Sequence, residues 1–123
     1  VIDRARAAPT PLCRIDFQQT GGALADVAND ATAFWGRDAE WNVPLNAITS
    51  DAARDREACM AWGRETMDAL APSSVGVYSV ELRPGFPETH AEVDAAFGGN
   101  LPRLRALRGR IDPDRVLGSY YPI

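Results

Sequence analysis

One stretch, from Phe97 to Leu117, constrains the fold of this chain more than any other; it reads FGGNLPRLRALRGRIDPDRVL. Gly98 and Gly99 are expected to break any helix that precedes them, because glycine adopts backbone angles that other residues resist. Asn100 then predicts a helix start, since its side-chain oxygen can accept an unpaired amide hydrogen of the first turn. The sequence therefore predicts a break and a new helix within four residues.

The residues after this start have helical periodicity. Apolar residues recur at helical spacing and arginines occupy the positions between them. The apolar set is Leu101, Leu104, Leu107 and Ile111, and the basic set is Arg103, Arg105, Arg108 and Arg110. Pro102 is tolerated in the first turn, where its missing N–H has no partner to lose, and Asp112-Pro113 ends the pattern. We expect one amphipathic helix docked on an apolar surface, followed by an extended tail.

Length and charge narrow the class of protein. A chain of 123 residues, with 46% hydrophobic and 24% charged residues, is long enough for one compact domain and too ordinary in composition for bulk disorder. Its net charge of −4 provides no basic field to attract nucleic acid or anionic lipid. No apolar run approaches the length that spans a membrane. We expect no nucleic-acid or membrane partner, and a cytoplasmic location.

The sequence contains few cysteines and histidines that could bind a metal or act in the catalytic site of a hydrolase. Cys13 and Cys59 are too few for a disulfide framework, and both lie in apolar patterns that predict buried free thiols. His90 is the only histidine and is expected on the surface, so the sequence predicts no metal site. No nucleophile elbow is present. The chain begins at Val1 without a signal-type segment, and we expect a piece of a longer protein or a processed product.

Strand and helix patterns alternate along the chain. Residues 1–11 are expected to be a connector or the remainder of an earlier helix, and 84–87 a loop. Strands are expected at 12–18, 32–37, 40–48 and 75–82, and helices at 23–28, 50–70 and 89–97. A hairpin is expected around 36–38 and a bulge or sheet edge at Pro44. The predicted class is α+β: an antiparallel sheet with helices packed on one face, a closing amphipathic helix and the tail.

The closing stretch resembles a family signature. An aromatic-Gly-x-Asn sequence, an Arg-Leu pair after two more residues, a basic apolar helix and Asp-Pro before a final apolar residue are similar to the end of berberine-bridge-enzyme-like FAD-linked oxidases. The matching residues are Phe97, Gly98, Asn100, Arg103, Leu104, Asp112, Pro113 and Leu117. A capped helix with no connection to flavin is the alternative explanation.

The resemblance extends upstream to most of residues 12–123. Gly21-Gly22 followed by Asp30 to Phe34 and Arg37 is similar to a Gly-Gly … Thr-Ala-Phe-x-x-Arg segment in the family's substrate domain. The strand expected at 77–81 is similar to the family's Tyr-x-Asn-Tyr strand, with Tyr78 at the first tyrosine. This chain departs from that pattern, because Val80 replaces the asparagine and Glu81 the second tyrosine.

The resemblance implies that this chain is one part of a larger enzyme. Residues 1–11 are then a connector, 12–83 the C-terminal half of a substrate domain, and 84–123 the berberine-bridge-type terminal segment. FAD is expected to be held mainly by an upstream domain absent from this chain, which also lacks a G-x-G-x-x-G loop. The flavin-binding domain of the same protein and a small-molecule substrate are the implied partners. The isolated chain is expected to be inactive.

The implied reaction oxidises a small alcohol, sugar or natural product by hydride transfer to the flavin, with electrons returned to oxygen. A base must accept the substrate's proton within hydrogen-bond distance. Glu81 is the first candidate for this base, and Asp16 is the second, or else an orienting group beside Arg14. If the strands lie side by side, polar residues converge on one sheet face. These are Arg14, Asp16, Gln18, Asn42, Asn46, Ser79 and Glu81.

The remaining candidates have two interpretations each. Arg14, Gln18, Asn42, Ser79 and Tyr78 are the expected substrate-binding residues, although a polar sheet face is commonly only solvated. By strand parity, Tyr78 is expected on the face opposite Glu81, with its hydroxyl at the rim of the core.

Asn100 resembles the family residue near the flavin ring, and it also suits a helix cap. Arg37 is expected to pair with Asp16 or Glu40. The three tryptophans, Trp35, Trp41 and Trp62, are expected in the core. The alternative for the whole chain is a non-enzymatic α+β module that binds a ligand through its polar face or forms a homodimer.

Overall fold

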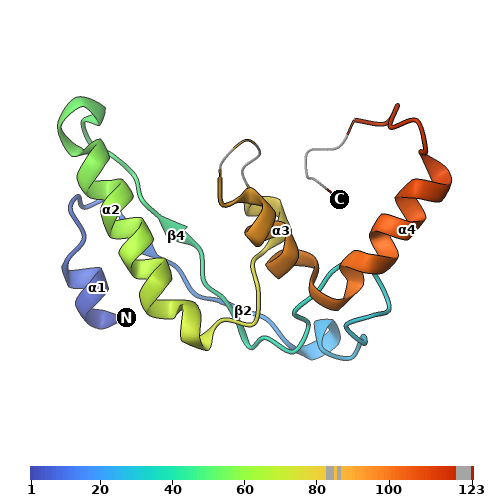
Figure 1. Cartoon of the computed structure of the whole chain (residues 1–123). Helices are drawn as coiled ribbons and strands as arrows, with labels where there is room; N and C mark the ends of the chain where they lie inside the picture. Colours follow the sequence, from blue (N-terminus) through green and yellow to red (C-terminus); the bar gives the residue numbers. More distant parts are fainter. Residues whose placement is uncertain (83–84, 86, 119–122) are drawn as a thin grey trace. The chain divides into compact units, whose positions relative to one another are not determined.

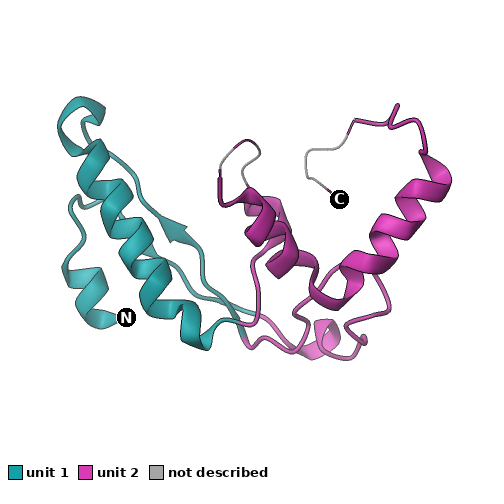
Figure 2. Cartoon of the chain, viewed as in Figure 1, with its two compact units in different colours: residues 1–19, 41–74 teal, residues 20–40, 75–123 magenta. Residues whose placement is uncertain are grey.

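The computed structural model describes residues 1–82, 85, 87–118 and 123. The described chain divides into two compact units. Unit 1 contains residues 1–19 and 41–74, and unit 2 contains residues 20–40 and 75–123 (Figure 2). These units follow spatial contacts within this chain, and they do not test the assignment of 12–83 and 84–123 to parts of a larger enzyme.

Unit 1 is a two-stranded antiparallel ribbon with helices (Figure 1). Its elements are α1 (Ile2–Arg6), β1 (Arg14–Ile15), β2 (Gln18–Gln19), β3 (Trp41–Asn42), β4 (Leu45–Asn46), α2 (Ala52–Leu70) and the 3-10 helix η2 (Ala71–Ser73). β1 pairs with β4 and β2 pairs with β3, and both pairs are antiparallel. Arg14 lies opposite Asn46, and Gln18 opposite Asn42, so one register continues through both pairs.

The ribbon is interrupted where Pro44 lies. Proline has no backbone N–H to donate to a ladder, which explains an irregularity at the position where the sequence predicted a bulge or sheet edge. The carbonyl oxygen of Pro44 still accepts a hydrogen bond from the amide of Asp16, at 3.0 Å, and this bond bridges the two short ladders. The partner of the 40–48 segment is therefore the 12–19 segment, and the hairpin predicted around 36–38 is wrong.

The long helix α2 buries one narrow stripe of side chains. Asp51 caps it by accepting a hydrogen bond from the amide of Ala53, so the predicted start at Ser50 is displaced by one residue. Cys59, Trp62 and Thr66 are its buried residues, at helical spacing. Cys59 and Trp62 form the core of unit 1 with Cys13.

Hydrogen bonds hold α1 against α2. The Trp62 indole nitrogen donates to the main-chain oxygen of Arg4 at 2.7 Å. The Arg4 guanidinium donates to Glu65 at 2.6 Å and to the Thr66 hydroxyl at 3.4 Å. The N-terminal segment is therefore a short helix tied to α2, which agrees with its expected origin as part of a helix.

Unit 2 contains α3 (Thr89–Phe97), which matches its predicted bounds, and α4 (Leu101–Ile111). Short 3-10 helices accompany them in the described part of the unit: η1 (Gly22–Leu24), η3 (Ser79–Glu81) and η4 (Gly98–Asn100). The core of the unit is apolar and comes from the flank of η3 and from both α-helices. Its buried members are Leu82, Val93, Ala96, Phe97 and Leu101.

The Gly98-Gly99 pair turns the chain from α3 into α4 and makes room for Trp35. Gly98 has φ +43 and ψ −128, a conformation that residues with a Cβ avoid. A Cβ on Gly98 would overlap three atoms of the Trp35 indole. A Cβ on Gly99 would lie 3.1 Å from the same ring. Glycine is therefore required at position 98 both for the backbone angle and for the close approach of the ring.

The α+β class is confirmed, but two of its predicted strands are wrong. Residues 32–37 form neither helix nor strand, and residues 79–81 of the predicted 75–82 strand form η3. Both stretches are rich in β-branched or aromatic residues, whose preference for strands is realised only when a partner strand is adjacent. The helix predicted at 23–28 is limited to the single turn of η1.

Two further expectations differ from the structure. Trp41 is 49% exposed on β3, so it is not a core residue, whereas Trp62 is buried and Trp35 half-buried. The loop predicted at 84–87 and the end of the predicted tail lie largely outside the described residues. Within the part of the chain that is described, no helix is both long and apolar enough to cross a bilayer.

A pair of glycine substitutions tests the turn. Gly98→Ala should lower the free energy of unfolding by about 2 kcal/mol or more, from the strained φ and the clash with Trp35. Gly109→Ala is the matched control, because it lies inside α4 and a Cβ added there would meet no atom within 4 Å. It should raise stability by up to about 1 kcal/mol. Urea unfolding measures both, and equal effects would contradict the assigned role of Gly98.

Candidate functional site

The two stretches of unit 2 that carry the family resemblance lie against each other. Asn100 is 2% exposed, and its side-chain nitrogen donates to the main-chain oxygens of Asn29 and Thr32, at 2.6 and 3.0 Å. Both hydrogens of the amide are thus used on a segment about seventy residues earlier in the chain. A buried amide with both hydrogens satisfied fixes the geometry of its partners.

Arg103, one turn further along α4, extends this contact. Its guanidinium donates to the oxygen of Asp30 at 2.7 Å and to that of Thr32 at 3.4 Å. Three main-chain carbonyls of the 29–32 turn are therefore held by two side chains at the start of α4. We call this set of contacts the α4 clamp: Asn100 and Arg103 on the carbonyls of Asn29, Asp30 and Thr32.

The clamped segment is also tied internally, through Asn29 and Arg37. The side-chain oxygen of Asn29 accepts from the amide of Arg37 at 2.7 Å, which closes the segment into a loop. The Arg37 guanidinium donates to the Thr32 hydroxyl at 2.7 Å and to the oxygen of Leu24 at 3.3 Å. It also lies over the Phe34 ring, 5.2 Å from its centroid.

These contacts correct two predictions. Arg37 was expected to pair with Asp16 or Glu40, but its guanidinium is used within the 24–37 stretch, and its Nε is buried with no hydrogen-bond partner among the described residues. Asn100 precedes α4 as predicted, but its side chain makes no capping hydrogen bond. The donors of the amide face the 29–32 turn, so the cap interpretation is wrong. The predicted role of Asn100 beside flavin is untested.

Tyr78, Ser79 and Glu81 lie around a single tight turn. The amide of Glu81 donates to the oxygen of Tyr78 at 3.0 Å, and residues three apart eclipse in a 3-10 turn. The parity argument that placed Tyr78 and Glu81 on opposite faces therefore fails. Glu81 is exposed and Ser79 half-buried. Tyr78 is 42% exposed and packs edge-on against Phe34, with ring centroids 6.3 Å apart.

The other predicted site residues lie on the ribbon of unit 1. Asp16 Oδ2 accepts from Arg14 at 3.0 Å and from the Asn46 amide at 2.8 Å. Across β2 and β3, the Asn42 amide donates to the Gln18 side-chain oxygen at 2.8 Å. Asp16 is thus held by two donors, and its expected roles, a base or an orienting group beside Arg14, stay predictions.

The structure thus brings the predicted residues together in two groups. Arg14, Asp16, Gln18, Asn42 and Asn46 share the ribbon of unit 1. Tyr78, Ser79, Glu81 and Asn100 belong to unit 2. The single face of three adjacent strands that was expected to unite them is wrong, because Ser79 and Glu81 are in η3 rather than in a strand.

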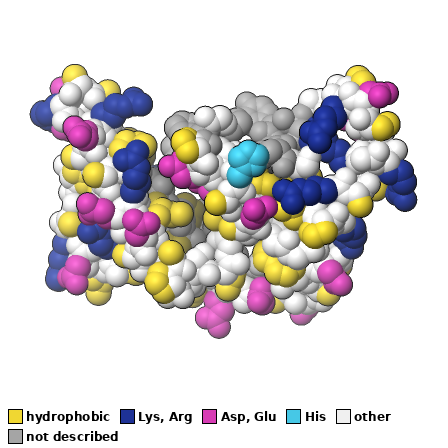
Figure 3. Space-filling view, viewed as in Figure 1, with side chains coloured by type: hydrophobic (Ala, Val, Ile, Leu, Met, Phe, Trp, Pro, Cys, Tyr) yellow, Lys and Arg dark blue, Asp and Glu magenta, His cyan; other side chains and the backbone are white. Residues whose placement is uncertain are grey.

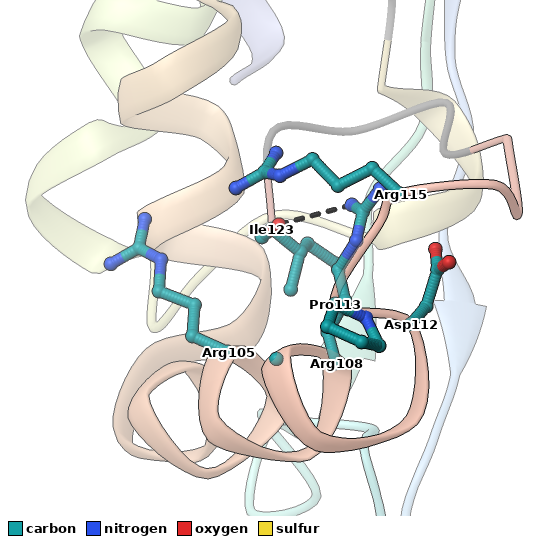
Figure 4. A pocket seen from close by; sticks show the side chains of 7 residues that line it. Arg105, Arg108, Asp112, Pro113, Arg115 and Ile123 are labelled. Atoms are coloured by element: carbon teal, nitrogen blue, oxygen red, sulfur yellow. Dashed lines mark hydrogen bonds between the residues drawn. The ribbon is translucent and has the colours of Figure 1, made fainter.

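An arginine-lined hollow in unit 2 was not predicted. It has a volume of about 520 Å³ and lies along the C-terminal half of α4, as Figure 4 shows. Arg105, Arg108 and Arg115 line it, together with Asp112 and Ile123. Arg108 donates to the main-chain oxygen of Ile123 at 3.0 Å, and the Asp112 carboxylate accepts from the amides of Val116 and Leu117. The hollow therefore combines three guanidinium groups with a carboxylate that is already held by the main chain.

Sequence reasoning missed the roles of Asn29 and Arg103. Arg103 was assigned to the solvated side of the helix, and its spacing of three from Asn100 was the available signal that both face one side. Asn29 had no such signal, because it lies in an irregular segment, where its side chain bonds to Arg37 and Asp38 and its main-chain oxygen accepts from Asn100. His90 is exposed (Figure 3), and the described residues contain no group of three or more metal-ligating side chains.

The residues that the structure describes do not by themselves fit a dinucleotide cofactor. The space beside Gly98 that could admit a phosphate is taken by the Trp35 ring. Gly21 and Gly22 lead into the three-residue η1, which is too short to present the N-terminal amides of a helix to a pyrophosphate. The glycines among the described residues therefore provide no cradle for the pyrophosphate of a flavin dinucleotide.

Comparison with known proteins supports a relationship to FAD-linked oxidoreductases. The chain is 28% identical over 89 residues to the FAD-linked oxidoreductase aurO of Gibberella zeae, covering 72% of this chain and 17% of that protein. It is 28% identical over 116 residues to the FAD-linked oxidoreductase sorD of Penicillium rubens, covering 93% of this chain and 24% of that protein. The chain thus spans less than a quarter of the length of these relatives. No protein-family model matches it, and no solved structure matches significantly.

Two substitutions of Asn100 test the α4 clamp. Asn100→Ala removes both hydrogen bonds and should cost about 2 kcal/mol of unfolding free energy. Asn100→Asp should cost more at pH 7, because a buried carboxylate would face two carbonyl oxygens instead of donating to them. That placement raises the pKa of the new carboxyl in the folded state, so the extra loss should shrink as pH falls toward about 4. Urea unfolding at both pH values measures this, and an Asp variant as stable as wild type at pH 7 would contradict the clamp.

Proposed function

We propose that this chain is the C-terminal, substrate-side part of a berberine-bridge-enzyme-like FAD-dependent oxidoreductase. The whole enzyme oxidises a small alcohol, sugar or natural product by hydride transfer to flavin. Most of the FAD contacts belong to a flavin-binding domain that precedes this chain. The observation that carries the proposal is the match over 93% of the chain to a protein named as an FAD-linked oxidoreductase.

The geometry of unit 2 supports this proposal. The terminal stretch that begins at Phe97 and the upstream 30–37 stretch were matched to the family independently, and the α4 clamp joins them. A chance resemblance of two unrelated segments would not require them to be in contact. Asn100 is then the expected cofactor-side residue, although its amide hydrogens are used to hold the 29–32 turn.

The turn at η3 supplies the proposed catalytic group. Glu81 is exposed in this chain, so its carboxylate is accessible to a substrate or to a covering domain. Tyr78 belongs to the same turn and offers a phenolic hydroxyl that can orient the substrate.

The ribbon of unit 1 supplies the proposed substrate-binding groups. Arg14, held by Asp16, and the Gln18–Asn42 pair present polar side chains along two paired segments. Side chains that are fixed by one another lose little entropy when they bind a substrate. A homodimer or ligand-binding module without flavin remains the alternative, and the following experiment separates it from the proposal.

The flavin requirement is tested by absorbance. The chain alone should be colourless and inactive, and the native gene product that includes its upstream sequence should be yellow, with flavin released on denaturation. The control is the longer product with FAD removed and then restored. A gene product without any flavoprotein sequence upstream, or a colourless stable dimer that ignores FAD, would overturn the proposal.

The proposed role of Glu81 as the catalytic base is tested by the substitution Glu81→Gln in the complete enzyme. The glutamine keeps the shape but accepts no proton, so kcat should fall by about 10²-fold or more, across the whole pH range of activity. Glu57→Gln is the matched control, because Glu57 is an exposed carboxylate on α2 and should leave kcat unchanged. Tyr78→Phe should raise KM more than it lowers kcat. Turnover of the Glu81 variant equal to that of wild type would remove this residue from the mechanism.

A further inference from the structure

The two cysteines of the chain meet in the core of unit 1. Cys13 Sγ lies 3.6 Å from Cys59 Sγ, which is direct contact between two free thiols. They come from residues 46 positions apart, one in the segment before β1 and the other on α2. Cys13 is 8% exposed and Cys59 is 1% exposed. Both sulfurs are therefore held in position by packing, with Cys13 the one nearer to solvent.

The polar groups around the sulfurs compete for one acceptor. The main-chain oxygen of Ile48 is approached by the Thr10 hydroxyl at 2.7 Å, by Cys13 Sγ at 3.4 Å and by Cys59 Sγ at 3.6 Å. A carbonyl oxygen has two lone pairs, so it does not satisfy three donors well at once. Loss of the two thiol protons would leave the strong Thr10 bond in place and remove the competition.

The surroundings of the two thiols shift their pKa values in opposite directions. Burial raises the pKa of Cys13, but the hydrogen-bonding groups around its sulfur, first among them the side chains of Thr10 and Cys59, outweigh this effect, and the pKa is lowered overall. Burial and the neighbouring Cys13 raise the pKa of Cys59. Because the thiolate is the nucleophile, Cys13 is the sulfur that reacts first.

We propose that Cys13 and Cys59 form an oxidation site, at which hydrogen peroxide converts the contacting thiols into an intramolecular disulfide. The Cys13 thiolate attacks one peroxide oxygen, the O–O bond breaks, and Cys13 becomes a sulfenic acid with release of hydroxide. The Cys59 sulfur then displaces the sulfenic oxygen as water, and the S–S bond forms. Overall, two thiols and one peroxide give one disulfide and two waters.

The new bond would join the segment before β1 to the centre of α2. The sulfurs must approach by about 1.5 Å to reach bonding distance, a shift that the exposed 11–12 end of the segment can absorb. Cross-linking residues so far apart in sequence restricts the unfolded chain strongly. Oxidation therefore stabilises unit 1 and fixes the ribbon against its helix. This inference does not rest on the proposed function, because the peroxide is supplied from outside.

The test uses the reduced full chain and hydrogen peroxide. Thiol titration in denaturant should fall from two free thiols to none, and the product should run as a monomer on a non-reducing gel. Trypsin should then release peptides 7–14 and 57–64 as one linked species, which dithiothreitol separates. The midpoint of thermal unfolding should rise by roughly 10 °C on oxidation and return on reduction.

Cys13→Ser and Cys59→Ser are the matched controls, and neither should gain thermal stability or yield the linked peptides. If a serine variant does not fold, the peptide mapping of the wild-type chain still decides the question. Two outcomes overturn the proposal. One is a native chain whose thiols resist peroxide concentrations that oxidise the unfolded chain. The other is oxidation to sulfinic acid or to intermolecular dimers without the 7–14 and 57–64 link.

Discussion

The arrangement of unit 2 depends on the α4 clamp, in which two side chains hold three main-chain carbonyls. Residues 29–37 form no helix or strand, so their carbonyls have no ladder to satisfy them. Asn100 and Arg103 supply the missing donors from the first turn of α4. The glycine turn before α4 then admits the Trp35 ring of the same segment. An irregular loop thus becomes a defined surface because a helix start recognises its backbone.

This interaction gives a physical reason for the spacing of the terminal motif. The glycines make room for an aromatic ring, and Asn100 and Arg103 are three residues apart because both must face one loop. The clamp needs no charged side chain on the loop, because Asn100 and Arg103 donate to main-chain carbonyl oxygens. Such a loop can carry functional side chains on its outer surface, and Tyr78 of the η3 turn packs against Phe34 within it. Tyr78 therefore packs on a loop that the terminal segment holds in place.

The sequence was sufficient to predict the elements that local patterns determine. It was insufficient to predict the contacts that depend on backbone atoms far away in the chain. The long helix α2, the bounds of α3 and the amphipathic α4 were predictable from periodicity and from the glycine and proline residues that end helices. The segments 32–37 and 75–82 have strand-like composition but no adjacent strand to pair with. The side chain of Asn100 was misread because its position favours a cap, whereas its partners lie on a remote turn. The contact between Cys13 and Cys59 could not be predicted from the sequence, because it joins residues 46 positions apart.

Amide hydrogen exchange measured by NMR on the full chain and on its Asn100→Ala variant tests the clamp most directly. The Arg37 amide, which donates to the Asn29 side chain, reports on the clamped loop without touching Asn100. The clamp predicts that its protection falls by about tenfold or more in the variant, while amides in the middle of α2 keep theirs. Unchanged protection at Arg37, with Asn100 removed, would contradict the claim that the start of α4 holds the loop in place.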